Sequence, residues 1–134
     1  MEIRWAQGRD KGCLAQLDRH IRPAELETSI RLGRVAVAEE EGQLVGWYRY
    51  NLFWDNTPFL NMLYLLEGHR GLGYGRQMMA HWEAQMRAAG YRAAMTSAVA
   101  AEGTQAFYEK LGYHQVGGFW PVGEGFEVLL AKEL

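Results

Sequence analysis

Apolar residues in the first quarter of the chain recur mainly at helical intervals. Residues 2–6 predict a short strand, after which Asp10 is placed to cap a helix with an apolar face. The apolar side chains of that face are Cys13, Leu14, Leu17 and Ile21. Pro23 suits the first turn of a second helix, which Gly33 is suited to end. This segment therefore predicts one strand followed by two helices.

The apolar pattern then changes to one typical of strands. Residues 34–40 and 43–53 are rich in Val, Leu, Trp and Tyr, and they flank a polar turn at 40–42. This arrangement predicts a hairpin. A further strand is predicted over 59–66.

Residues 73–89 carry the strongest helical pattern in the chain. One face holds Met78, Met79, Trp82 and Met86, and the opposite, polar face includes Arg76, Gln77, Glu83 and Arg87. Because an amphipathic helix buries its apolar face, we expect this stripe to pack against the sheet. Gly90 is suited to end the helix. The remaining segments predict a strand at 91–97, a helix at 104–111 and a terminal strand pair at 113–119 and 125–131.

A glycine-rich turn at 71–75 joins the apolar strand to this amphipathic helix. Glycines permit positive φ and close approach of backbone amides to an anion, and the start of a helix adds unpaired N–H groups with partial positive charge. Arg70 adds a permanent cation. The turn lacks the Gly-x-Gly-x-x-Gly spacing of a dinucleotide site, and no Gly-Lys-Ser or Gly-Lys-Thr of a Walker A loop occurs in the chain.

Two motifs carry a resemblance to a known family. Arg70-x-x-Gly73-x-Gly75 resembles the acetyl-CoA pyrophosphate loop of the GNAT superfamily of N-acetyltransferases, and residues 106–113, with Tyr108 and Gly112, resemble the helix end Phe-Tyr-x-x-Leu-Gly-Phe/Tyr of that superfamily. The alternative interpretation of the first motif is a tight strand-to-helix turn with a solvated Arg70. Two motifs in the family order favour the resemblance.

The resemblance implies an α/β (α+β) fold. It consists of a mixed, mostly antiparallel twisted sheet with a V-shaped cleft between strands 4 and 5, flanked by about four helices. The predicted order β, α, α, β, β, β, α, β, α, β, β is the family order. We expect one domain over residues 1–134, because the length and the 49% hydrophobic content suit a single core.

The resemblance also implies a chemistry: direct transfer of an acetyl group from acetyl-CoA to an amine. The family spacing places the backbone amide that faces the thioester oxygen at Leu65 and the proton donor to the CoA sulfur at Tyr108. The alternative for Tyr108 is a packed aromatic side chain. The expected cofactor-binding residues are Leu65, Arg70, Gly71, Leu72, Gly73, Tyr74, Gly75, Arg76 and Tyr108.

The sequence leaves the general base open among four candidates: Glu67, Asp55, Glu25 and His69. The chain departs from the family pattern at Ala101, where an Asn is common, and at Glu67, where a Pro is common. No metal is expected, since the four histidines are scattered.

Aromatic residues cluster around the predicted hairpin and the late strands: Trp47, Tyr48, Tyr50, Trp54 and Trp120. Cross-strand packing is the favoured interpretation for most of them. The polar turn at 54–58, which begins with Trp54, is a better candidate for substrate contact.

Composition excludes several classes of partner. The formal net charge is −2, and no basic stripe indicates nucleic-acid binding. Cys13 is the only cysteine, which excludes an internal disulfide and fits the reducing cytoplasm. We expect its thiol to be either a small buried hydrophobic group or inert. No segment resembles a secretory signal or a membrane span, so we expect a soluble, cytoplasmic protein.

The function predicted first is an N-acetyltransferase acting on the primary amine of a small molecule. The alternatives are a protein or peptide N-acetyltransferase and, in another class, a non-catalytic acyl-CoA-binding sensor or assembly module. A homodimer is compatible with each. The acceptor, the oligomeric state and the acyl-chain preference are left open by the sequence.

Overall fold

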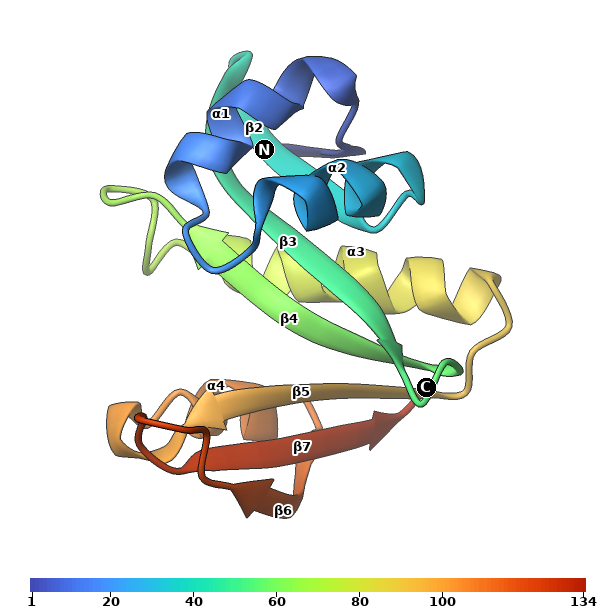
Figure 1. The fold of residues 1–134 in the computed structure, drawn as a ribbon, viewed down its shortest axis with the longest axis vertical. Coiled ribbons are helices and arrows are strands. Elements are labelled where there is room, and N and C mark those ends of the chain that lie inside the picture. The colour runs from blue at the N-terminus through green and yellow to red at the C-terminus, as the bar shows by residue number, and fades with distance from the viewer. The chain divides into compact units, whose positions relative to one another are not determined.

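The computed structural model describes all residues from Met1 to Leu134. In chain order the elements are β1 (Glu2–Trp5), η1 (Gly8–Asp10), α1 (Lys11–Leu17), α2 (Pro23–Arg31), β2 (Val35–Glu40), β3 (Gln43–Phe53), β4 (Thr57–Leu65), α3 (Tyr74–Ala88), β5 (Ala93–Val99), η2 (Ala100–Glu102), α4 (Gln105–Lys110), β6 (His114–Phe119) and β7 (Glu127–Glu133) (Figure 1). Here η1 and η2 are short 3₁₀ helices. The predicted order of strands and α-helices is confirmed.

The chain forms two compact units. The first unit comprises Met1–Asn51 and Met62–Met78, and the second comprises Leu52–Asn61 and Met79–Leu134. All three boundaries between the units fall within regular elements, so that β3, β4 and α3 each contribute residues to both units. The interpretation of 1–134 as one domain stays a prediction.

The strands form a mixed sheet in the order β1-β2-β3-β4-β5-β7-β6. In the first unit β2 is antiparallel to both β1 and β3. In the second unit β5 pairs antiparallel with β7 over its whole length, whereas its parallel pairing with β4 is limited to Phe59–Met95 and Leu60–Thr96. The mixed, mostly antiparallel sheet is thus confirmed, and the V-shaped opening beside β4 stays a prediction.

The edge strand β6 is irregular. It pairs antiparallel with β7, but the register shifts between Gln115 and Gly117. All of its residues are exposed, including Val116 and Phe119. The strand therefore carries a bulge in the middle of its only pairing.

The core of the first unit lies between its two helices and its strands. Leu14 of α1 and Leu26 of α2 pack with Val35, Val37 and Trp47 of β2 and β3. Pro23 begins α2, as predicted, and Gly33 follows the helix end with φ of 72°. The second predicted helix is confirmed.

The first helix differs from the prediction in the role of its cap residue and in its length. Asp10 occupies the N-cap position of α1, but its carboxylate makes no cap hydrogen bond, because it forms an ion pair with Arg4 at 2.8 Å and accepts the Gln7 N–H at 2.7 Å. The helix ends at Leu17, so Ile21 lies outside it. Cys13 is exposed, which excludes the buried alternative and leaves that of an inert thiol, because only Leu14 turns toward the core and adjacent helical positions are about 100° apart.

The apolar stripe of α3 is buried, as predicted. Met78, Met79, Trp82 and Met86 are each at most 2% exposed.

None of the helices combines the length and the apolar character needed to cross a membrane.

Candidate active site

The loop between β4 and α3 has the backbone conformation that its glycines permit. Gly68, Gly71 and Gly73 have φ of 89°, 75° and 83°. A Cβ atom on any of the three would meet no atom within 4 Å. These glycines are therefore required by the left-handed backbone and not by a lack of space, and the loop forms an open cradle.

The start of α3 supplies hydrogen-bond donors at the end of this loop. The Gln77 N–H donates to the Gly73 carbonyl at 3.1 Å, the helical i to i−4 bond that begins the helix. The preceding amides, those of Tyr74, Gly75 and Arg76, therefore have no acceptor within the helix. Together with the open glycine backbone, they form a site that fits a diphosphate.

Arg70 folds back onto the end of β4. Its Nε donates to the Leu65 carbonyl at 3.0 Å, and its guanidinium lies 5.1 Å from the centre of the Tyr64 ring. The Tyr64 ring in turn stacks on Trp47, with 4.8 Å between the ring centres. The cation at the start of the loop is thus held by β4 residues that the sequence did not connect with it.

The end of β4 is positioned by a close approach of β3. The Leu66 N–H donates to the Val45 carbonyl at 2.8 Å. Because successive amides of a strand point to opposite edges, the Leu65 N–H points away from β3. A Cβ on Gly46 would lie 2.5 Å from the Tyr64 carbonyl oxygen, so this contact requires glycine. The sequence analysis did not single out Gly46, although a glycine inside a strand signals close backbone approach.

Tyr108 lies on α4 in the second unit and is 6% exposed. Its ring makes edge-on contacts with Phe107 and Tyr113. Its hydroxyl interacts with that of Thr96, and the Thr96 hydroxyl donates to the Leu60 carbonyl at 3.0 Å. Burial raises the pKa of Tyr108, and the Thr96 hydroxyl partly offsets this shift. A neutral phenol with a hydroxyl partner is suited to deliver a proton.

The turn after α4 is attached to α3 through Glu83. Tyr113 Oη donates to Glu83 Oε2 at 2.9 Å, and Lys132 Nζ donates to Glu83 Oε1 at 2.8 Å. Glu83 is 5% exposed, so its assignment to the polar face of the helix is wrong. A buried carboxylate needs such partners, and both are distant in sequence, which is why the helical pattern alone misplaces it.

A buried ion pair holds the connection between α1 and α2 against β3. Arg49 Nε lies 2.7 Å from Asp18 Oδ2, which also accepts the Trp47 Nε1–H at 3.1 Å. Burial opposes ionisation of Asp18, but the hydrogen bond and charge of Arg49 outweigh it and hold the pKa of Asp18 below its usual range. The sequence analysis named neither member of this pair.

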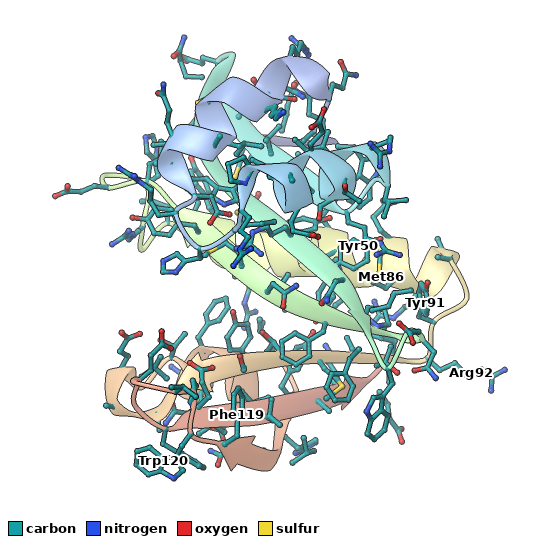
Figure 2. The ribbon with its side chains drawn as sticks, in the orientation of Figure 1. Tyr50, Met86, Tyr91, Arg92, Phe119 and Trp120 are labelled. Atoms are coloured by element: carbon teal, nitrogen blue, oxygen red, sulfur yellow. The ribbon has the colours of Figure 1, made fainter.

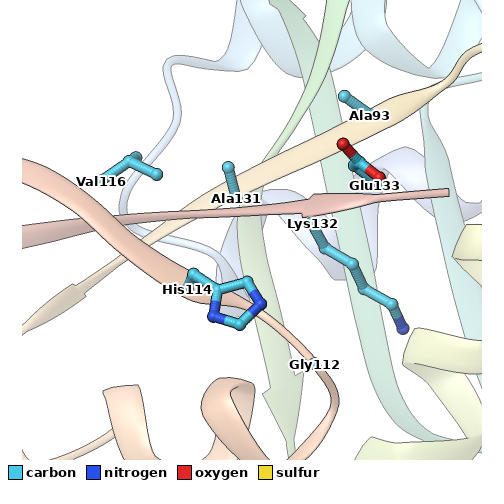
Figure 3. A pocket seen from close by; sticks show the side chains of 7 residues that line it. All are labelled: Ala93, Gly112, His114, Val116, Ala131, Lys132 and Glu133. Atoms are coloured by element: carbon cyan, nitrogen blue, oxygen red, sulfur yellow. The ribbon is translucent and has the colours of Figure 1, made fainter.

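A hollow is present elsewhere in the second unit. A cavity of about 590 Å³ lies against β5, β6 and β7, and its lining includes Ala93, His114, Val116 and Ala131 (Figure 3). It includes no residue of the two sequence motifs except Gly112. In the first unit the candidate cofactor-binding segment is the loop with Leu65, and in the second unit the candidate residue is Tyr108; this hollow includes neither.

A family model covers most of the chain. The model described as the acetyltransferase (GNAT) family matches residues 3–113. The chain belongs to the GNAT family. It is accordingly an acyltransferase, and the resemblance of the two motifs is confirmed. No curated protein matches the chain in a sequence comparison.

Solved structures share the fold of this GNAT chain over its whole length. A ribosomal-protein-alanine N-acetyltransferase from Brucella melitensis is 23% identical, with 100% of both chains covered and a TM-score of 0.83. YncA from Salmonella typhimurium, solved with acetyl-CoA, is 18% identical over 100% of this chain and 94% of that one, with a TM-score of 0.81. Naa50 from Arabidopsis thaliana, in complex with the bisubstrate analogue CoA-Ac-MVNAL, is 15% identical over 99% and 98%, with a TM-score of 0.79. These complexes are consistent with acetyl-CoA as the cosubstrate.

Three of the four predicted general bases are exposed. Glu25 and Glu67 are exposed in the first unit, and Asp55 is exposed in the hairpin turn of the second. His69 is half-buried, with its Nδ1 3.6 Å from Glu40 Oε2. No group of three or more His, Cys, Asp or Glu side chains converges on a metal-binding geometry.

The aromatic residues divide as the packing interpretation predicts. Trp47 and Tyr48 are buried in the core. Trp54 is 80% exposed at a hairpin turn in which both it and Asp55 have positive φ. Trp120 is also exposed, and Figure 2 shows it next to Phe119 at the end of β6.

Proposed function

We propose that this GNAT protein transfers the acetyl group of acetyl-CoA to the primary amine of a small molecule, by direct attack while both substrates are bound. The observation that carries the proposal is the open loop, with left-handed Gly71 and Gly73 and the amide donors at the start of α3. In this proposal the amides of residues 71–76 hold the diphosphate. The exposed Leu72 side chain leaves the backbone of the loop accessible.

The thioester of acetyl-CoA supplies an activated carbonyl carbon. Leu65 N–H would donate a hydrogen bond to the carbonyl oxygen as negative charge develops on it, because this amide points away from β3. Arg70, bound to the carbonyl of the same residue, would hold the strand end in place. The Leu65 amide is thus assigned an orienting and charge-stabilising role.

Tyr108 is assigned the proton donor to the departing thiolate. Its buried environment keeps the phenol protonated, since burial disfavours the charged form. The Thr96 hydroxyl donates its single proton to the Leu60 carbonyl, and it would support the phenol oxygen by turning that proton toward it as the phenol proton leaves. No covalent enzyme intermediate is required.

The first candidate acceptor is the primary amine of a small molecule. A peptide amine is the second candidate. It is favoured by the full-length likeness to the Brucella ribosomal-protein-alanine enzyme and to Naa50 with its peptide-bearing analogue. Acetyl-CoA-dependent thiol release, measured with polyamines, aminoglycosides, amino acids and short peptides, distinguishes the two acceptor classes.

The cofactor assignment is tested by a matched pair of glycine variants. Gly73→Ala and Gly33→Ala both place a Cβ on left-handed backbone, with φ of 83° and 72°, and neither Cβ meets an atom within 4 Å. We expect Gly73→Ala to weaken CoA binding in calorimetry at least about ten-fold, a loss of 1.4 kcal/mol, while Gly33→Ala leaves it unchanged. Absence of CoA binding by the unmodified protein would contradict the proposal. Tight binding without turnover on any amine would favour the acyl-CoA sensor instead.

A further inference from the structure

A single carboxylate contacts both flanks of the glycine loop. Glu40, the last residue of β2, accepts a short hydrogen bond from the Tyr74 hydroxyl through Oε1. Its other oxygen, Oε2, lies 3.6 Å from His69 Nδ1. His69 immediately precedes Arg70, and Tyr74 immediately follows Gly73. Glu40 therefore joins the two ends of the loop from a different strand. It is separated from Tyr74 by 34 residues in sequence.

Core packing does not fix this loop. Residues 70–73 are exposed, and the Cβ positions of Gly71 and Gly73 face open space. Arg70 is held by the Leu65 carbonyl and the Tyr64 ring. At the other end of the loop, the Tyr74 hydroxyl donates a hydrogen bond to the Glu40 carboxylate. The shape of the cradle thus depends on a few polar contacts at its flanks.

The negative charge of Glu40 excludes it as a direct ligand of a bound anion. A carboxylate repels a diphosphate, so it cannot be one of its binding groups. Its two oxygens are directed instead at a hydroxyl donor and at an imidazole that forms an ion pair with it when protonated. This arrangement is that of an acceptor shared between two neighbouring segments.

We propose that Glu40 is a positioning residue that holds the loop from His69 to Tyr74 in its cofactor-binding shape before CoA arrives. The inference rests on the proposed function of the loop. A segment ordered in advance loses less conformational freedom on binding, so the contact raises affinity without touching the cofactor. It acts on acetyl-CoA binding and not on the acetyl transfer step.

The test compares Glu40→Ala, Glu40→Gln and Tyr74→Phe with Glu41→Gln. Glu41 is the adjacent exposed residue of the hairpin turn, so its variant removes the same charge without touching the loop contacts. We expect Glu40→Ala and Tyr74→Phe each to weaken CoA binding in calorimetry about ten-fold, equivalent to 1.4 kcal/mol. For Glu40→Ala the KM for acetyl-CoA should rise in parallel, with kcat at saturating acetyl-CoA within about two-fold of the unmodified enzyme.

Two further readouts separate positioning from general stability. Glu40→Gln keeps an oxygen acceptor for Tyr74, so it should bind CoA more tightly than Glu40→Ala. Hydrogen exchange of the ligand-free protein should speed up in the loop segment of Glu40→Ala and Tyr74→Phe and stay unchanged in Glu41→Gln.

The outcomes distinguish this inference from the function on which it rests. If the unmodified protein binds CoA and Glu40→Ala binds it equally well with unchanged exchange, the positioning role is rejected and the proposed function stands. If the unmodified protein binds no CoA, the proposed function itself fails. Should Glu40→Ala not fold, Tyr74→Phe, which removes one hydroxyl from a partly exposed side chain, decides the question on the same criteria.

Discussion

Tyr113 donates a hydrogen bond to Glu83 Oε2 at 2.9 Å, and both side chains are buried. This bond joins the turn after α4 to α3 across thirty residues of sequence. Lys132 from β7 meets the other oxygen of the same carboxylate. The aromatic residue that closes the second family motif therefore acts as an anchor for the helix that carries Tyr108.

Tyr113→Phe should destabilise the second unit. Removing the hydroxyl leaves one oxygen of a buried carboxylate without this donor, which costs about 1–3 kcal/mol. Urea denaturation of the variant should show a lower midpoint with an unchanged slope. Tyr91→Phe, at a half-buried tyrosine, serves as the control. Equal midpoints for the unmodified protein and Tyr113→Phe would remove the anchoring role.

Tyr108→Phe should lower turnover and spare cofactor binding. Loss of a general acid typically reduces the rate about 100-fold or more, whereas the ring remains to fill its site in the core. Steady-state kinetics and CoA calorimetry on the same variant separate the two effects. A kcat equal to that of the unmodified enzyme would show that Tyr108 only packs.

The partner of Tyr108 gives a second, independent measurement. Thr96→Val is nearly isosteric and removes the hydroxyl that interacts with the phenol, while Thr96→Ser retains a hydroxyl. We expect Val to lower kcat about ten-fold and to shift the alkaline limb of the pH profile, and Ser to restore most of the activity. Equal kcat and equal pH profiles for Val and Ser would mean that the Thr96 hydroxyl does not assist the phenol.

Gly46→Ala should distort the end of β4. The added Cβ would lie 2.5 Å from the Tyr64 carbonyl oxygen, which forces a backbone shift next to Leu65. Overpacking of this kind costs about 1–3 kcal/mol, and the free energy of unfolding should fall accordingly. Gly12→Ala is the matched control, because its Cβ meets nothing within 4 Å in α1 and the change favours helix by about 1 kcal/mol. Equal stability of the two variants would contradict the close approach of β3.

The Asp18–Arg49 pair should make stability depend on acid pH. Because the pKa of Asp18 is lowered in the folded protein, its contribution is present above the unfolded pKa of about 3.9 and is lost as the pH falls below that value. Asp18→Asn leaves Arg49 buried without its counter-charge and should cost about 3–5 kcal/mol at pH 7. The difference from the unmodified protein should shrink below about pH 4. Asp55→Asn, at an exposed position, should show no such convergence.

Local patterns in the sequence were sufficient for most of the fold. The hairpin around residues 40–43, the start of α2 at Pro23 and the buried stripe of α3 each depend on neighbouring residues, and all three were predicted correctly. The glycine loop was also predicted, because positive φ at Gly71 and Gly73 follows from local turn chemistry. Such features can be predicted without knowing what packs against them.

The placement of an acidic side chain was predicted wrongly, or not at all, where its partner lies outside the local sequence pattern. Asp10 was expected to cap a helix, but Arg4 competes for its carboxylate. Glu83 was assigned to the polar face of its helix, and Glu40 was placed in a solvated turn, without its contact to Tyr74. In each case the partner lies outside the local pattern, and a charge-assisted hydrogen bond is strong enough to override that pattern.

The irregular pairing of β6 bears on how copies of this protein can meet. A straight edge strand offers evenly spaced free N–H and C=O groups to an incoming strand, whereas the shift between Gln115 and Gly117 interrupts that spacing. Addition of a strand from a second copy to the β6 edge is thereby disfavoured, although Val116 and Phe119 are exposed there. Self-association here is therefore expected to use side chains more than shared backbone hydrogen bonds.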